Sequence, residues 1–190
     1  MKSWVEKLKK LLGLSKKSSG FTLIELLVVI GILGILAAAL VATINPFEQL
    51  NKAQDSNVEN TLVEYVNGNV RYYTTRQAMP WLDASNTDPN VTNCVQDYNA
   101  AGSAFTAENL TNIMPCVNAL VDDNELQSSF TGVSNILDQI YITGGSTSVT
   151  ACYAPKSKSM QNNLNTKFNS SGGLAGSSCP GSAGCFWCNE

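Results

Sequence analysis

The sequence predicts an α+β fold in which a long, kinked N-terminal helix packs on a small antiparallel sheet followed by a disulfide-held C-terminal tail. Four observations predict it. Residues 21–44 form an apolar run with one charged side chain, and residues 47–73 repeat apolar side chains at steps of three and four. Residues 136–154 contain two β-prone segments around a Gly-Gly pair, and all six cysteines lie beyond residue 90.

The charges are divided unevenly along the chain. Residues 1–20 hold six Lys and one Glu, whereas the remainder holds six cations and fourteen carboxylates, a net charge of −8. A basic start before an apolar run predicts a membrane-inserted protein whose lysine-rich side stays in the cytoplasm. The acidic remainder argues against nucleic-acid binding through bulk electrostatics, because phosphate binding requires clustered Lys and Arg.

The first seventeen residues have a helical pattern. Apolar side chains fall on one face and lysines fill much of the rest, which predicts a short amphipathic helix on an anionic membrane surface. A merely solvated basic tail is the alternative. Residues 18–20, Ser-Ser-Gly, form a hinge.

The apolar run from Phe21 to Ile44 is long enough for a membrane-spanning helix, which needs about 20 residues. Its one charge is Glu25. It is too long for the apolar region of a secretory signal, and it continues past the small residues at 37–39 that imitate a cleavage site. Pro46 follows and predicts a kink, because proline lacks an N–H and clashes with the carbonyl four residues earlier.

A helical pattern resumes at Phe47 and ends before Pro80. We therefore expect one helix from about Phe21 to about Ala78, apolar in its first half and amphipathic in its second. The expected apolar stripe consists of Phe47, Leu50, Val58, Leu62, Tyr65, Val66, Val70 and Tyr73.

The remainder is expected to cover this stripe. Residues 83–105 have the composition of a loop, and residues 106–126 have helical spacing interrupted by Pro115. Residues 136–142 and 149–154 predict a β-hairpin that turns at Gly144-Gly145. The predicted regions are thus 1–20, a basic leader; 21–45, the apolar half-helix; 46–80, the amphipathic half; and 81–190, a globular head.

The cysteines predict structural disulfides, because an even number confined to the translocated part indicates an oxidising compartment. They are Cys94, Cys116, Cys152, Cys179, Cys185 and Cys188. One hypothesis pairs Cys94 with Cys116 and Cys152 with a cysteine of the tail, but the sequence alone cannot choose among the possible pairings. Redox activity or metal binding at the final Cys-x-x-Cys are the alternatives.

No His occurs in the chain, which excludes Ser-His-Asp and Cys-His nucleophilic sites. The acidic run at residues 122–125 lacks the ligand spacing of a calcium loop and is interpreted as a solvated face. Four aromatic side chains are interpreted as packing rather than as a stacking surface for DNA or sugar: Tyr72, Tyr73, Trp81 and Trp187. We expect no cofactor, no metal and no catalytic residue.

Residues 20–38, GFTLIELLVVIGILGILAA, resemble the N-terminal signature of type IV pilins and type II secretion pseudopilins. The resemblance implies that a prepilin peptidase cuts after Gly20 and that Phe21 becomes the N-methylated terminus. It implies that Glu25 serves methylation and assembly. The leader of twenty residues is nearer to that of the longer-leader subclass.

The resemblance implies a structural subunit of a pilus or pilus-like secretion or competence filament, not an enzyme. Its implied partners are other copies of the chain, minor pilins, the peptidase and an inner-membrane assembly platform. The precursor would span the inner membrane once with a cytoplasmic N-terminus, and the filament would lie in the periplasm or at the cell surface.

Glu25 is unusual because it is a carboxylate within an apolar segment. A carboxylate in a transmembrane helix costs roughly 2.5–3.5 kcal/mol near the centre and less near the end. Cleavage would give each subunit an amine at Phe21, with which the Glu25 of a neighbour could pair and so fix the register. A Glu that snorkels to the interface is the alternative. Two other functions remain open: a single-pass anchored binding module that never polymerises, and a thiol-redox protein using Cys185 and Cys188.

Overall fold

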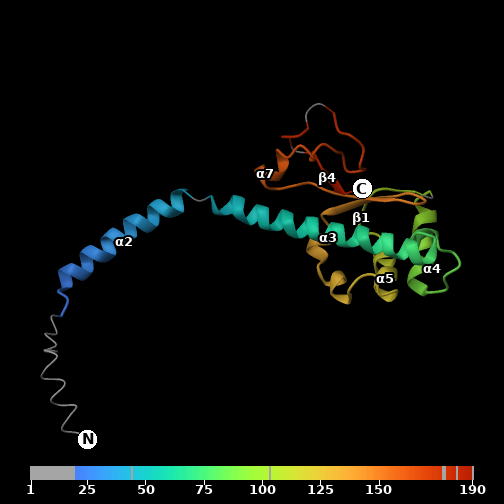
Figure 1. Ribbon diagram of the computed structural model, residues 1–190, viewed down its shortest axis with the longest axis horizontal. Coiled ribbons are helices and arrows are strands. Elements are labelled where there is room, and N and C mark those ends of the chain that lie inside the picture. The colour runs from blue at the N-terminus through green and yellow to red at the C-terminus, as the bar shows by residue number, and fades with distance from the viewer. Residues whose placement is uncertain (1–19, 44, 103, 177–178, 183, 190) are drawn as a thin grey trace, which may run out of the picture. The chain divides into compact units, whose positions relative to one another are not determined.

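The computed structural model describes residues 20–189 except 44, 103, 177–178 and 183. The predicted amphipathic helix at residues 1–17 lies outside these residues, as does most of the leader. The chain forms two compact units, residues 1–45 and 46–190. The predicted α+β fold class is confirmed (Figure 1).

Two helices occupy the region predicted as one kinked helix. Helix α2 spans Leu23–Thr43 and α3 spans Pro46–Arg76, so the division falls beside the proline. Proline is favoured at the first position of a helix, where its missing N–H has no intrahelical acceptor. Helix α2 has a mean hydropathy of 2.8 over Leu23–Val41, and none of that segment is buried.

Helix α3 carries the core of the second unit on one stripe. Its buried positions are Asp55, Val58, Leu62, Tyr65, Val66, Gly68, Asn69 and Tyr72. The expected stripe is correct in its middle, but Phe47, Leu50 and Val70 are exposed. Helix α3 ends at Arg76, where Gln77 takes a positive φ of 56° and its N–H donates to the Tyr73 carbonyl.

The loop expected at residues 83–105 is wrong, because α4 spans Pro89–Ala100. The Asp88 side chain caps the helix by accepting from the N–H groups of Asn90 and Val91. Val91, Cys94 and Tyr98, spaced three and four apart, are buried. The Asp-Pro start and this spacing were the missed signals. A short 3₁₀ helix, η1 (Pro80–Leu82), precedes α4 and buries Trp81.

The helix expected at residues 106–126 is also wrong in its first part. Strand β1 spans Phe105–Asn109, and α5 begins only at Met114 and ends at Asp122. Pro115 begins this helix instead of interrupting it, since the first turn tolerates proline. A second 3₁₀ helix, η2 (Ser128–Gly132), and α6 (Ser134–Leu137) follow.

The predicted hairpin is present as β2 (Ile140–Gly144) and β3 (Val149–Tyr153), with α6 in place of its first residues. The tail adds α7 (Lys158–Gln161) and β4 (Trp187–Asn189). The four strands form an antiparallel sheet in the order β1-β2-β3-β4. Figure 1 shows α3 between the tail, with α7 and β4, and the helices α4 and α5.

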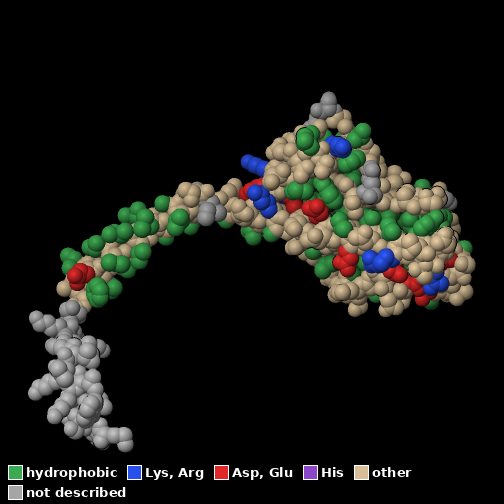
Figure 2. Space-filling model, viewed as in Figure 1, with side chains coloured by type: hydrophobic (Ala, Val, Ile, Leu, Met, Phe, Trp, Pro, Cys, Tyr) green, Lys and Arg blue, Asp and Glu red, His purple; other side chains and the backbone are tan. Residues whose placement is uncertain are grey.

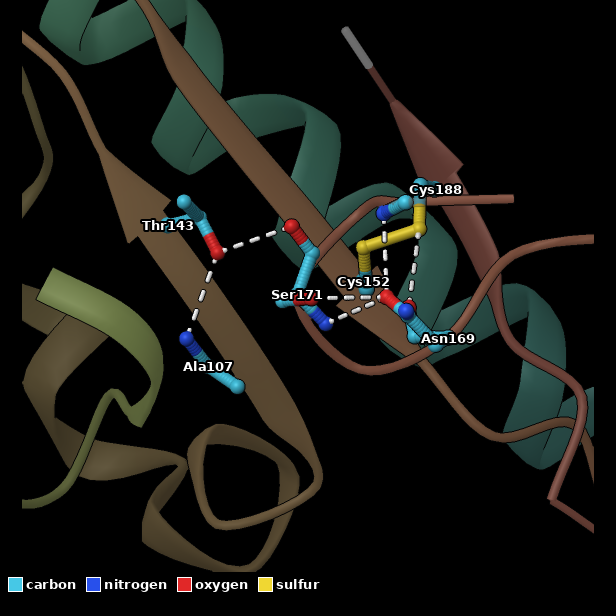
Figure 3. The surroundings of a disulfide bond; sticks show 7 residues. Ala107, Thr143, Cys152, Asn169, Ser171 and Cys188 are labelled. Atoms are coloured by element: carbon cyan, nitrogen blue, oxygen red, sulfur yellow. Dashed lines mark hydrogen bonds between the residues drawn. A yellow bond between two sulfur atoms is a disulfide. The ribbon is translucent and has the colours of Figure 1, made fainter. Parts of the chain in front are cut away.

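The tail is fixed to the sheet by a disulfide and by a loop. Cys152 of β3 and Cys188 of β4 are opposite residues in the strand register and form a disulfide (Figure 3). Asn169 Oδ1 accepts from the N–H groups of Ser171 and Gly173, and the Ser171 carbonyl accepts from Thr143 Oγ1 of β2. Gly172 is required here: its φ is +82°, and a Cβ would lie 2.7 Å from the Thr150 side chain.

A buried carboxylate joins the tail to α3. Asp55 is 2% exposed, and its two oxygens accept from the backbone N–H groups of Lys156 (2.9 Å) and Ser157 (2.8 Å). Ser157 in turn caps α7 by accepting from the Met160 N–H. The contact bridges about one hundred residues of sequence, so it fixes where the chain leaves the sheet.

A second polar cluster lies near the C-terminal end of α3, where it connects this helix to the segment after η1. The Tyr72 hydroxyl donates to Asp83 Oδ2 at 2.9 Å, and Ser85 Oγ donates to Asp83 Oδ1. Burial raises the pKa of Asp83, but the hydrogen bonds from Ser85 and Tyr72 and the charge of Arg76 outweigh it, and the net pKa lies below the ordinary value. Burial raises the pKa of Tyr72 to about 12.

We predict that Asp55→Asn lowers the free energy of unfolding by about 2–3 kcal/mol, because one acceptor is replaced by an NH₂ that faces backbone donors. Urea denaturation of the detergent-solubilised chain measures the loss. Ser56→Ala, at the exposed neighbouring position, should change stability by less than about 0.5 kcal/mol. Equal stability of Asp55→Asn and wild type would contradict the assigned role.

We also predict that Asp83→Asn destabilises the head near neutral pH by about 1–3 kcal/mol. Because the folded-state pKa lies below 3.8, the stabilisation is present above pH 3.8 and is lost as the pH falls through the folded-state value. Urea midpoints of the two proteins should therefore converge in acid. The exposed Asp138→Asn serves as control, and a difference for Asp83→Asn that grows in acid would refute the assignment.

Candidate functional site at the start of the apolar helix

The candidate site lies where the chain enters α2. Gly20 and Phe21 precede the helix, and the Phe21 side chain is 85% exposed. No described atom lies within 4 Å of the position that a Cβ on Gly20 would occupy. Within the described residues, the Gly20–Phe21 peptide bond is therefore uncovered.

Thr22 and Glu25 form a reciprocal cap at the helix start. The Thr22 N–H and hydroxyl each donate to Glu25 Oε2 at 2.8 Å, and the Glu25 N–H faces Thr22 Oγ1 at 3.3 Å. This is the capping box, in which Thr or Ser and a Glu three residues later satisfy each other's backbone donors. A carboxylate in the first turn also interacts favourably with the helix dipole.

This cap changes the interpretation of Glu25. From the sequence, Glu25 is expected to lack a partner until cleavage supplies an amine. The structure instead gives it a partner within its own chain, and the signal was present as Thr22-x-x-Glu25. A shallow apolar hollow of about 310 Å³, lined by Phe21, Ile24, Glu25, Val28 and Val29, flanks this carboxylate.

All six cysteines are described, and all are in disulfides: Cys94–Cys116, Cys152–Cys188 and Cys179–Cys185. The first joins α4 to α5, and the first two agree with the pairing hypothesis. Cys185 and Cys188 belong to different disulfides, so the Cys-x-x-Cys is not a redox pair here and presents no thiolate.

The acidic run at residues 122–125 lies at the surface, and its three carboxylates are paired there with side chains of α3 and α4. Asp123 accepts two hydrogen bonds from the Arg76 guanidinium, at 2.8 and 3.0 Å. Glu125 pairs with Arg71 Nε at 2.9 Å, and Asp122 accepts from Asn90. The end of α5 is thereby held to α3 and α4. Within the described residues, no group of three His, Cys, Asp or Glu side chains is placed to hold a metal ion.

The aromatic residues predicted to pack do so in part. Tyr72 and Trp81 are buried, and Trp81 lies edge-on to Phe105 and donates its indole N–H to the Gly145 carbonyl. Tyr73 and Trp187 are partly buried against the same core.

In a comparison with protein families, residues 15–41 match the prokaryotic N-terminal methylation motif. Searches of curated proteins and of solved structures found no match. The matched segment contains Gly20, Phe21, Thr22 and Glu25, together with most of α2.

The described residues combine a capped apolar helix, long enough to cross a membrane, with a disulfide-bonded α+β head, and this fold is pilin-like. The methylation motif is the hallmark of type IV pilin and pseudopilin precursors, and residues 15–41 of this chain carry it. The motif indicates a structural subunit rather than an enzyme. It also implies assembly with a prepilin peptidase and membrane machinery.

We predict that Thr22→Val loosens the first turn of α2, because an N-cap hydroxyl contributes about 1 kcal/mol. Amide hydrogen exchange in detergent micelles should become roughly fivefold faster at the Glu25 N–H. Thr43→Val, at the other end of α2, removes a hydroxyl that donates to the Leu40 carbonyl and should leave Glu25 unchanged. Identical exchange in wild type and Thr22→Val would show that the cap does not hold this turn.

Proposed function

We propose that the chain is a structural subunit of a type IV pilus or of a pilus-like filament of a secretion or competence system. The precursor is cut after Gly20, methylated at the new Phe21 amine and polymerised through α2. The methylation motif over residues 15–41 carries this proposal. The uncovered Gly20–Phe21 bond supports the cleavage step.

The exposure of α2 supports polymerisation. Its large apolar side chains from Leu23 to Val41 are between 48% and 81% exposed, a surface that must be covered by lipid or by other helices. In the precursor the inner membrane covers it. In a filament the α2 helices of neighbouring subunits take over, with Gly31 and Gly34 allowing close approach.

Glu25 links the two states. Both hydrogen bonds from Thr22 end on Oε2, and Oε1 can accept from a second donor. Cleavage creates one, the Phe21 amine, on every copy of the chain. A carboxylate–amine pair between subunits is strong in an apolar surrounding and opposes any other axial register, because a shifted helix leaves both charges unpaired.

The alternatives differ in their requirements. An anchored module that never polymerises needs neither cleavage nor Glu25. A thiol-redox function is not favoured, because Cys185 and Cys188 are in separate disulfides.

The test is expression in a host that has a prepilin peptidase and a pilus assembly system. Wild type should lose residues 1–20, gain one methyl group, retain three disulfides by intact mass, and form filaments visible by electron microscopy. Gly20→Val should stay full-length in the membrane and form none, because the side chain blocks the peptidase. Gly31→Val is the matched control and should be cleaved normally.

Glu25→Ala separates the proposal from the anchored module. We expect it to be cleaved but not assembled, since its helix lacks the charge partner for the neighbouring amine. Filaments from uncleaved Gly20→Val, or normal filaments from Glu25→Ala, would refute the proposed assembly.

A further inference from the structure

The head, residues 46–190, is electrically polarised along the chain. Residues 46–138 hold three cations and twelve carboxylates, a net charge of −9. Residues 139–189 hold Lys156, Lys158 and Lys167 and no carboxylate, and the next acidic residue is Glu190. We call residues 154–189 the basic lobe.

The basic lobe presents its lysines on a fixed backbone. All three lysines are exposed. The Lys156 N–H is held by Asp55, the Lys158 turn begins at the Ser157 cap, and Lys167 Nζ lies 5.5 Å from the Phe168 ring centroid. Leu164 and Leu174 of the same lobe are 79% and 73% exposed. The lobe therefore presents apolar as well as basic surface to a partner.

An acidic hollow lies elsewhere on the head, between α3 and the segment that follows α5. It has a volume of about 610 Å³ and includes Glu64, Arg71, Glu125 and Gln127. Arg71 is already paired with Glu125, so the exposed Glu64 leaves the hollow with a net charge of −1. Carboxylate, amide and hydroxyl oxygens at its rim suit an ammonium group, which donates three hydrogen bonds.

The two surfaces are arranged for a head-to-tail contact. Figure 1 shows the basic lobe on one side of α3 and α5 on the other. On the face shown in Figure 2, acidic side chains lie along and below α3 with basic ones among them, and the part above α3 shows basic side chains. Complementary patches at different places on one chain generate a heterologous interface, which extends into a helical filament when its rotation does not close.

We propose that the basic lobe of one copy of this chain docks on the acidic hollow of a neighbouring copy, with a lobe lysine against Glu64. This contact rests on the proposed filament and would add a contact between the globular heads of neighbouring subunits to the packing of α2. Charge complementarity supports a second copy as the partner, because each copy supplies both surfaces. A polyphosphate partner is disfavoured, since the head's overall charge is negative.

Zero-length carbodiimide cross-linking of sheared wild-type filaments tests the contact, because it joins a lysine amine to a carboxylate only when the two touch. We expect covalent dimers whose junction peptides connect Glu64 with Lys156, Lys158 or Lys167. Glu64→Gln, and separately the three lysines changed to Gln, should remove this junction. Asp97→Asn, on α4, should retain it.

Exchanging the charges of the two surfaces distinguishes loss of the contact from loss of folding. Glu64→Lys filaments and filaments with all three lobe lysines changed to Glu should each dissociate at lower salt than wild type, because like charges then meet. The combined variant should regain the wild-type salt tolerance. Far-ultraviolet circular dichroism should be the same for all.

The outcomes separate the two proposals. Absence of any wild-type filament overturns the proposed function and this contact together. Wild-type filaments without the Glu64 junction, with the junction only inside single subunits, or with no rescue by the combined variant overturn the contact and leave the proposed function standing.

Discussion

The head depends on the stripe that α3 buries, and within that stripe on the carboxylate of Asp55. A buried carboxylate is unfavourable unless donors surround it, and the N–H groups of Lys156 and Ser157 provide them. The bond fixes the exit of β3 and the start of α7 against α3. The sheet, the tail disulfide and the lobe therefore share one reference point on the helix.

The two units of the chain are built for different surroundings. The head has its own core, in which Leu62, Tyr65 and Trp81 are fully buried. Helix α2 buries nothing within the described structure and relies on its environment to cover it. The Thr22–Glu25 cap lets the start of α2 lie in an apolar surrounding. It satisfies backbone N–H donors and gives the carboxylate hydrogen bonds that lipid cannot supply.

The fold class and the hairpin were predictable because they rest on local signals: the uncharged run after Glu25, the stripe around Val58 and Leu62, and the Gly144-Gly145 turn. The helix α4 was missed because its polar composition is typical of a loop, although Asp88-Pro89 is a signal for the start of a helix. The sequence suggested Cys94–Cys116 but could not establish it, since pairing depends on how α4 and α5 meet. Arg71–Glu125 and Asp55 with Lys156 join residues more than fifty positions apart, which no local pattern encodes.

The residues of the candidate site were predictable from the sequence, but the hydrogen bonds between them were not. Gly20, Phe21 and Glu25 stand out in a linear motif, and the family comparison matches the same segment. The local partner of Glu25 follows from where α2 begins, at Leu23 and not at Phe21. Because the helix begins two residues after Phe21, Thr22 occupies the N-cap position and the Glu25 carboxylate is capped instead of isolated.

The disulfide between β3 and β4 has a mechanical consequence. Strand β4 is three residues long, and hydrogen bonds over so short a strand separate readily under load. The Cys152–Cys188 bond gives a pulling force a covalent path from the end of the lobe directly into the sheet. The 35 residues between the two cysteines are then bypassed by tension. Pulling at the C-terminal end therefore cannot extend these residues while the disulfide is intact.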